Sequence, residues 1–334
     1  MFIMKGLRKV LTPFAPDQSG AVSVLYELGG IIVIADAGGC AGNICGFDEP
    51  RWENEKSAVF SAGLRDMDAI MGRDDRLADK IADAASKIEA HFIAVIGTPV
   101  PAVIATDWRA LERMIEKRCG LPVITIDTNG MELYDKGQEK ALFAVYEKFA
   151  GEKYEKVPQK TGILGAAPPD FGKMCPPLSL DDIKKASSAR INIAVSPAAV
   201  KTARLLEKRF GTPYEIRCPD ELLYFPDGDF EGRNILIVHQ HVIADTLRKR
   251  FTKVGASNVT CAGWFMLSKE IMSPGDISLK EEDDFEKLVK DGGFDIIAAD
   301  AALKPLAKGF AGEWIDYPHF ALSGRMPAIE SKSV

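Results

Sequence analysis

The chain has 334 residues, of which 46% are hydrophobic and 27% are charged. This length corresponds to about two or three domains, each large enough to bury a core. With 42 Lys and Arg against 48 Asp and Glu, the net charge is −6, which argues against nucleic acid and anionic membranes as partners. No apolar run reaches the roughly 18 residues of a membrane span, and the N-terminus lacks the apolar core of a signal peptide. We therefore expect a cytoplasmic protein.

Short apolar runs typical of buried strands alternate with helical patterns along the whole chain, which is the pattern of parallel α/β sheets. In the first part of the chain, strands are predicted at 31–36, 92–97 and 122–127, and helices at 20–28, 74–90, 107–117 and 131–150. This order is typical of a Rossmann-like domain, for which we predict the bounds 1–155.

The alternation continues in two further segments. Residues 151–160 are charged and patternless, and are expected to link the first domain to a second one at 156–225. In the second domain, strands are predicted at 162–165, 191–195 and 214–217, and helices at 180–186 and 198–210. In the third domain, at 226–334, strands are predicted at 234–239, 258–263 and 294–299, and helices at 243–254, 280–290 and 303–308.

The loop after the first predicted strand carries the strongest functional signal. Gly38 and Gly39 allow the backbone to approach a bulky group, and Cys40 and Cys45 follow them. Loops beyond the carboxyl ends of parallel strands are where ligands bind. However, two thiolates cannot complete a four-cysteine site, and free cysteines are most often buried small hydrophobic residues. The residues alone therefore leave both a metal site and a structural role open.

The other four cysteines are isolated in the sequence. Cys119 follows a helix at a Cys-Gly-Leu-Pro cap, which favours a structural role. Cys175, Cys218 and Cys261 each stand alone and are expected to be buried or inert thiols. Cys175 and Cys218 lie in predicted loops, so distal metal ligation is the alternative for these two.

Other candidate residues carry two readings each. His239 and His241 end a predicted strand on one face, which fits a metal or substrate pair, or a polar strand end with one histidine capping the next helix. For Arg51, the two roles are neutralising the charge of a metal cluster bound nearby and binding an acidic partner. Trp52 fits packing at a subunit interface or simple exposure.

The sequence motifs of several enzyme classes are absent from this chain. The sequence has no G-x-x-x-x-G-K-[S/T] phosphate loop, so ATP hydrolysis by this chain is not expected. No G-x-G-x-x-G follows a predicted strand, which argues against a nicotinamide dehydrogenase. A G-x-S-x-G serine elbow is also missing.

Residues 20–43, GAVSVLYELGGIIVIADAGGCAGN, resemble the start of nitrogenase component 1 chains, where a helix and a strand lead into a His-Gly-Pro-x-Gly-Cys loop. The similarity continues in order through residues 67–81, 91–131, 188–216 and 294–318. The chain is therefore identified as a divergent member of the nitrogenase component 1-type oxidoreductase superfamily, which includes nitrogenase molybdenum–iron proteins and dark-operative protochlorophyllide reductases. The resemblance implies Rossmann-like parallel-sheet domains, with an abbreviated middle domain in this chain.

The resemblance also implies a cofactor and partners. In the family, the loop cysteine that corresponds to Cys40 ligates an iron–sulfur cluster between two subunits, and we expect Gly38 and Gly39 to border it. Cys45 has no equivalent in that motif. In a two-fold dimer, Cys40 and Cys45 of both chains would supply four thiolates, the number that a [4Fe–4S] cluster needs. The expected partners are a second copy or a paralogous chain, and an ATP-dependent iron protein as electron donor.

Departures from the family pattern narrow the function. Thr98-Pro99 replaces a Thr-Cys pair, and Ser196 stands where the nitrogenase α chain has its molybdenum–iron cofactor cysteine. His319 lies where family chains place residues near the substrate cavity. We expect an iron–sulfur oxidoreductase subunit that reduces an unknown substrate other than dinitrogen. The alternatives are a metallocofactor carrier or maturation scaffold without turnover, and a metal-free protein that keeps only the fold.

Overall fold

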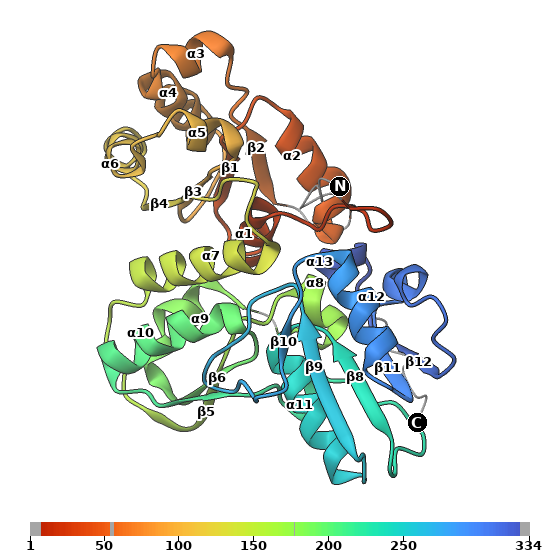
Figure 1. Cartoon of the computed structure of the whole chain (residues 1–334). Coiled ribbons are helices and arrows are strands. Elements are labelled where there is room, and N and C mark those ends of the chain that lie inside the picture. Colours follow the sequence, from red (N-terminus) through yellow and green to blue (C-terminus); the bar gives the residue numbers. More distant parts are fainter. Residues whose placement is uncertain (1–7, 54–56, 177, 328–334) are drawn as a thin grey trace.

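The computed structural model describes residues 8–53, 57–176 and 178–327 (Figure 1). These residues form three sheets in which all neighbouring strands run parallel. The strand orders are β2-β1-β3-β4, β5-β6-β7 and β10-β9-β8-β11-β12. The predicted α/β class with parallel sheets is therefore confirmed.

The strands are mostly short. The first sheet contains β1 (Ile31–Ile34), β2 (Ala58–Ser61), β3 (Ile93–Ile96) and β4 (Val123–Ile126). The second contains β5 (Val157–Leu164), β6 (Ala189–Ala194) and β7 (Tyr214–Ile216). The third contains β8 (Asn234–Val238), β9 (Asn258–Gly263), β10 (Ile277–Ser278), β11 (Ile296–Ala299) and β12 (Glu313–Asp316).

The helices that cover the sheets are α1 (Asp17–Leu25), α4 (Asp74–Ala85), α6 (Trp108–Cys119), α7 (Tyr134–Phe149), α10 (Val200–Phe210), α11 (His241–Lys253) and α12 (Glu282–Asp291). Shorter helices lie in the connections: α2 (Gly39–Asn43), α3 (Asp66–Ile70), α5 (Pro99–Val103), α8 (Pro168–Phe171), α9 (Leu180–Lys184) and α13 (Phe320–Ser323). None of the described helices has the length and apolar character needed to cross a bilayer.

Both faces of the first sheet are buried, as expected for uninterrupted apolar strands in a parallel sheet. Along β1, Ile32 and Ile34 pack against α1 and α7. Ile31 and Val33 point the other way and pack against α4 and α6. Burial of each such side chain contributes about 1.5–3 kcal/mol. The sheet is therefore a firm support for the loops at its carboxyl edge.

Helix α7 lies between the first and second sheets (Figure 1). On one side it packs against α1 through two glycines, because a Cβ on Gly137 would lie 1.6 Å from the carbonyl oxygen of Asp17. A Cβ on Gly20 would lie 1.8 Å from the carbonyl oxygen of Tyr134. On its other side α7 shares a core with α9 and α10. The first two sheets are thus joined through one helix.

The third sheet is covered by α11 on one face and by α12 and α13 on the other. The segment before α1 completes the second of these layers, because Leu11 and Phe14 pack there. The Ala15 amide donates to the carbonyl of Ala321 at 2.8 Å. The beginning of the described chain therefore helps to cover one face of the sheet that the end of the chain forms.

Three features differ from the sequence predictions. Strand β5 begins at Val157, inside the predicted linker, and its exposed polar residues are typical of an edge strand. The short edge strands β2, β10 and β12 were not predicted. The helix predicted at 303–308 is a 3₁₀ segment, Ala301–Leu306, because Pro305 has no amide hydrogen to continue an α-helix.

Candidate functional site

Cys40 and Cys45 lie in one helical segment directly beyond the carboxyl end of β1 (Figure 1). Helix α2 runs without a break into a single π-helical turn, Ile44–Asp48, which the Glu49 amide closes by donating to the carbonyl of Ile44 at 2.8 Å. Such turns are frequent at functional sites. Both thiols are half-buried, and Cys40 also packs against the first core.

Four glycines near the two cysteines leave the space beside them open. Gly38 has φ +119, a conformation that side chains rarely adopt, and starts α2. A Cβ added to Gly38, Gly39, Gly42 or Gly46 would meet no described atom within 4 Å. The segment therefore leaves room for a bulky group beside the thiols. Two soft thiol donors next to such a space fit an iron–sulfur cluster.

Two carboxylates anchor this segment, the buried Asp36 before it and the half-buried Asp48 at its end. Asp36, at the end of β1, is 1% exposed and accepts the Ala41 amide at 2.8 Å. Its other oxygen accepts the Ser61 hydroxyl at 2.6 Å, which ties the helix to β2. On the α1 side, Asp48 accepts the hydroxyl of Ser19 at 2.7 Å. The positions of the two cysteines are thus set before any ligand binds.

A buried ion pair anchors the second half. Arg51 donates to both carboxylate oxygens of Glu49 at 2.7 Å and to the carbonyl of Ser23 in α1 at 2.8 Å. Glu49 is 3% exposed. Planar two-point pairing of this kind orients both partners. Arg51 therefore fixes the end of the cysteine segment, and this contact could not be read from the sequence.

Local environment keeps both thiols protonated when no metal is bound. Burial, together with the negative charge of Asp36, raises the pKa of Cys40. Burial and the carboxylates of Glu49 and Asp36 raise the pKa of Cys45. Because a metal binds the thiolate, binding would release protons.

Large apolar side chains are exposed in all four loops that follow the strands of the first sheet. We call this set the apolar edge: Phe47 after β1, Met67, Ile70 and Met71 after β2, Val103 and Ile104 after β3, and Met131 after β4. Phe47 is 78% exposed, Val103 84% and Met131 87%. Parallel strands place these loops at one edge, together with Cys40 and Cys45. Exposed apolar groups gathered in this way mark an interaction site.

A second candidate region lies at the carboxyl edge of the third sheet. His239, after β8, and His319, after β12, have ring centroids 4.8 Å apart, and His319 stacks on Phe265 at 4.3 Å. His239 Nε2 donates to the carbonyl of Pro318 at 2.9 Å, so its Nδ1 carries a free lone pair. Within the described chain, His239 Nδ1 and both nitrogens of His319 have no hydrogen-bond partner.

Burial also keeps these two imidazoles neutral. It lowers the pKa of His239 to about 4, and burial with the neighbouring His239 lowers the pKa of His319 far below its ordinary value. The neutral form is the one that ligates metals. Buried polar atoms without a partner call for a bound water, ion or ligand.

Comparison with known proteins identifies the family. The model of the nitrogenase component 1 type oxidoreductases matches residues 19–219, more than half of the chain. The chain belongs to this family.

Individual relatives agree with this membership. The nitrogenase iron-molybdenum cofactor biosynthesis protein NifE of Clostridium pasteurianum is 23% identical over 343 residues, which cover 81% of this chain and 74% of the relative. A solved structure of nitrogenase Cp1 at pH 6.5 has a TM-score of 0.73 at 14% identity and covers 97% of this chain and 89% of its own. A second structure, nitrogenase Cp1 at pH 5, has a TM-score of 0.68. These two similarities show the fold.

Two positions at which the sequence was expected to depart from the nitrogenase component 1 pattern lie just beyond the carboxyl ends of strands. Pro99, expected in place of a cysteine, is exposed at the start of α5, and the preceding Thr98 donates its hydroxyl to the carbonyl of Ala35 at 2.8 Å. The hydroxyl of Ser196, which is 3% exposed, has no partner among the described residues. A Cβ on Gly165 would lie 2.5 Å from that hydroxyl, so the space beside Ser196 is small. Neither residue offers a thiolate.

The remaining predicted residues lie apart from the two regions. His241 is in separate hydrogen bonds, with Asp276 at 3.0 Å and with the Ser268 amide at 2.9 Å, so it forms no pair with His239. The helix cap is supplied by Gln240 and not by a histidine, because its side chain accepts the first amides of α11.

The other cysteines also lie elsewhere. Cys218 and Cys261 are buried in the core of the third sheet, and Cys119 packs behind the first sheet. Cys175 lines a cavity between the first two sheets. The described residues contain no group of three or more His, Cys, Asp or Glu side chains placed to hold a metal ion.

Proposed function

We propose that this chain is the cluster-binding subunit of a dimer that carries or assembles a metallocofactor. Two copies would meet at the apolar edge, and Cys40 and Cys45 of each would hold a [4Fe–4S] cluster between them. The observation that carries the proposal is the open, glycine-bordered position of these two thiols among exposed apolar side chains. The name of the NifE relative, a cofactor biosynthesis protein, supports the carrier or scaffold role.

The residues of this chain have distinct tasks in the proposal. Cys40 and Cys45 would lose their protons and bind iron, and the cluster would supply one-electron redox chemistry. Asp36 and the Arg51–Glu49 pair hold the cysteine segment at both ends. The apolar edge would exclude water from the interface. Ser196 offers no thiolate at the cofactor position, which agrees with a substrate or cargo other than that of dinitrogen reduction.

Anaerobic reconstitution tests the cluster and the dimer. We expect about four iron and four sulfide per two chains, and a dimer in size-exclusion chromatography with light scattering. Cys40→Ser and Cys45→Ser should each lose most of the iron. Cys119→Ser, the matched control, should keep it. A monomer without iron, or full iron content in the Cys40→Ser, Cys45→Ser double variant, would contradict the proposal.

If the chain is instead a subunit of a reductase, it should differ from a carrier in what happens after the cluster has been bound. The buried His239 and His319, whose ring nitrogens include three without a hydrogen-bond partner in the described chain, are the residues that would hold a substrate in this case. A nitrogenase-type iron protein with ATP would then reduce the cluster, a bound substrate would reoxidise it, and visible absorption would follow both steps. Transfer of metal and sulfide to a cofactor-free acceptor, without such turnover, would support the carrier role.

A further inference from the structure

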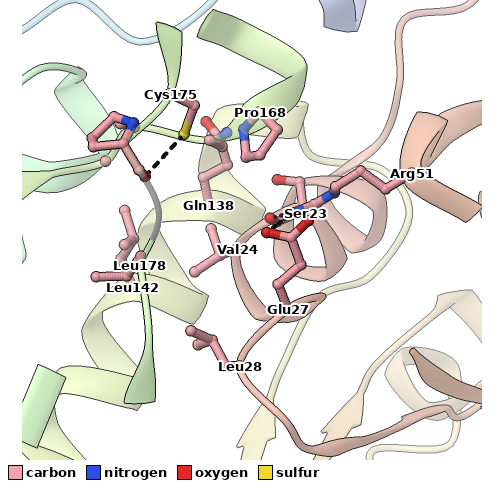
Figure 2. Close-up of a pocket in the computed structure, with 14 residues that line it drawn as sticks. Ser23, Val24, Glu27, Leu28, Arg51, Gln138, Leu142, Pro168, Cys175 and Leu178 are labelled. Atoms are coloured by element: carbon pink, nitrogen blue, oxygen red, sulfur yellow. Dashed lines mark hydrogen bonds and ion pairs between the residues drawn. The ribbon is translucent and has the colours of Figure 1, made fainter. Parts of the chain in front are cut away.

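A cavity of about 180 Å³ lies between the first and second sheets (Figure 2). It is bounded by α1, α7, the loop after β5 and the segment around Cys175. The loop belongs to the carboxyl end of a parallel strand, where ligands bind in such sheets. For comparison, a cavity of about 150 Å³ is enough to hold benzene. Neither the two cysteines of the proposed cluster site nor the histidine pair lines this cavity.

The lining has an apolar side and a polar side. Val24, Leu28, Leu142 and Leu178 form the apolar side, and Glu27, Arg51 and Ser23 lie together at the other (Figure 2). This pattern suits a ligand with a hydrocarbon body and one polar group.

The charged groups at the polar side of the cavity, Arg51 with Glu49 and Glu27, have a net negative charge. The guanidinium of Arg51 is already bound to both oxygens of Glu49 and to a backbone carbonyl. Glu27, whose side chain is 44% exposed, forms an ion pair with Arg51 at 3.6 Å. One cation therefore faces two carboxylates.

The inner end of the cavity adds no positive charge. Gln138 donates to Asp170 at 2.6 Å, behind the cavity wall. The Cys175 thiol is neutral, because burial and then Asp170 raise its pKa to about 12. An anionic ligand would meet net repulsion here, whereas a cation would face two carboxylates that share one guanidinium.

We propose that this cavity binds a small organic cation, with an apolar body of about benzene size against the leucines and an ammonium or amidinium group at Glu27. The cavity is lined by residues of α1, α7, the loop after β5 and the segment around Cys175, together with Arg51. None of them is a proposed cluster ligand or part of the apolar edge, so the proposal does not rest on the cluster or the dimer.

Three probes of equal size and different charge test the proposal on the full chain without cluster. In ligand-observed NMR and calorimetry, benzylammonium should bind at least about tenfold more tightly than benzyl alcohol, and benzoate should bind most weakly. Equal affinity of all three, or no binding of benzylammonium up to about 10 mM, would overturn the proposal.

Variants locate the binding. Glu27→Gln should weaken benzylammonium binding about tenfold and leave benzyl alcohol unchanged. Glu89→Gln makes the same charge change at an exposed residue away from the cavity and should have no effect. Ala166→Phe fills the cavity and should abolish binding of both probes. Unchanged binding in a folded Glu27→Gln variant, or in a folded Ala166→Phe variant by circular dichroism, would overturn the assignment.

Discussion

The carboxyl edges of the first and third sheets show two ways of finishing the same architecture. At the first sheet, the four loops expose large apolar side chains beside Cys40 and Cys45. At the third sheet, Phe14, Phe265 and α13 cover the edge, so that His239 and His319 are buried. The chain covers the third edge itself, which buries the two histidines. The first edge is left open and apolar, and it is the edge at which we propose that a second chain binds.

The two edges also differ in the protons that their donors carry. The thiols of the first edge are protonated and must lose a proton before they bind a metal. The imidazoles of the third edge are already neutral, because burial disfavours their charge. Metal binding at the first edge would thus release protons, whereas ligation by the imidazoles of the third edge would release none.

The largest expected effect is a loss of stability of the whole protein, which would disrupt both edges at once. Gly137→Ala places a methyl group against the backbone of α1 and should destabilise the protein by more than about 3 kcal/mol, because backbone atoms cannot yield. Urea unfolding followed by circular dichroism measures this. Gly42→Ala, where no described atom lies within 4 Å, is the control and should not reduce the free energy of unfolding. A loss of similar size in both variants would refute the role of the α1–α7 contact.

The next effect should separate the first edge from the third. Phe47→Glu and Val103→Glu place a charge on the apolar edge, and each should weaken the proposed dimer at least about tenfold by sedimentation equilibrium. Met272→Glu puts the same charge on the loop after β9, at the third edge, and should leave the dimer intact. Dissociation by Met272→Glu, with no effect of the other two, would reverse the assignment.

A pH series should report on the third edge. The folded-state pKa of His239, about 4, lies below its unfolded value of 6.5, so the folded state binds fewer protons between these values. Stability is therefore full above about pH 6.5 and falls as the pH is lowered, by up to about 1.4 kcal/mol per pH unit for each such histidine. His319→Phe, which keeps an aromatic ring on Phe265, should make this decline shallower in urea unfolding.

Two carboxyls act in the opposite direction in that series. Burial raises the pKa of Asp135 and of Asp170 to about 6, so their ionisation costs stability above that pH and the cost disappears as the pH falls towards 4. They contribute equally in wild type and His319→Phe. The difference between the two proteins therefore isolates the histidine, and identical pH profiles would show that His319 does not titrate as its burial requires.

The smallest expected effect is confined to the start of α11. Gln240→Ala removes the side chain that accepts the amides of Val242 and Ile243 in the first turn of the helix and should cost about 1 kcal/mol. Iron uptake at Cys40 and Cys45 should not change. A loss of iron uptake by a folded Gln240→Ala protein would mean that the two edges are coupled.

Prediction from sequence worked where a few neighbouring residues decide the outcome. The run Ile31–Ile34 is apolar throughout and became a strand buried on both faces. It failed for β5, because the exposed start of an edge strand carries charges like those of a linker. It also assigned the cap of α11 to a histidine, whereas the neighbouring Gln240 has the side chain that reaches the amides.

The sequence by itself determined the alternation of strands and helices, the family, and the loop in which Cys40 and Cys45 lie, since all of these depend on local order along the chain. Only the tertiary structure decided the pairing of His239 with His319, the gathering of the apolar edge, the clamp of Arg51 on Glu49 and Ser23, and the cavity beside Glu27. Each of these joins segments far apart in sequence. Their contact depends on how sheets and helices pack, which no local pattern records.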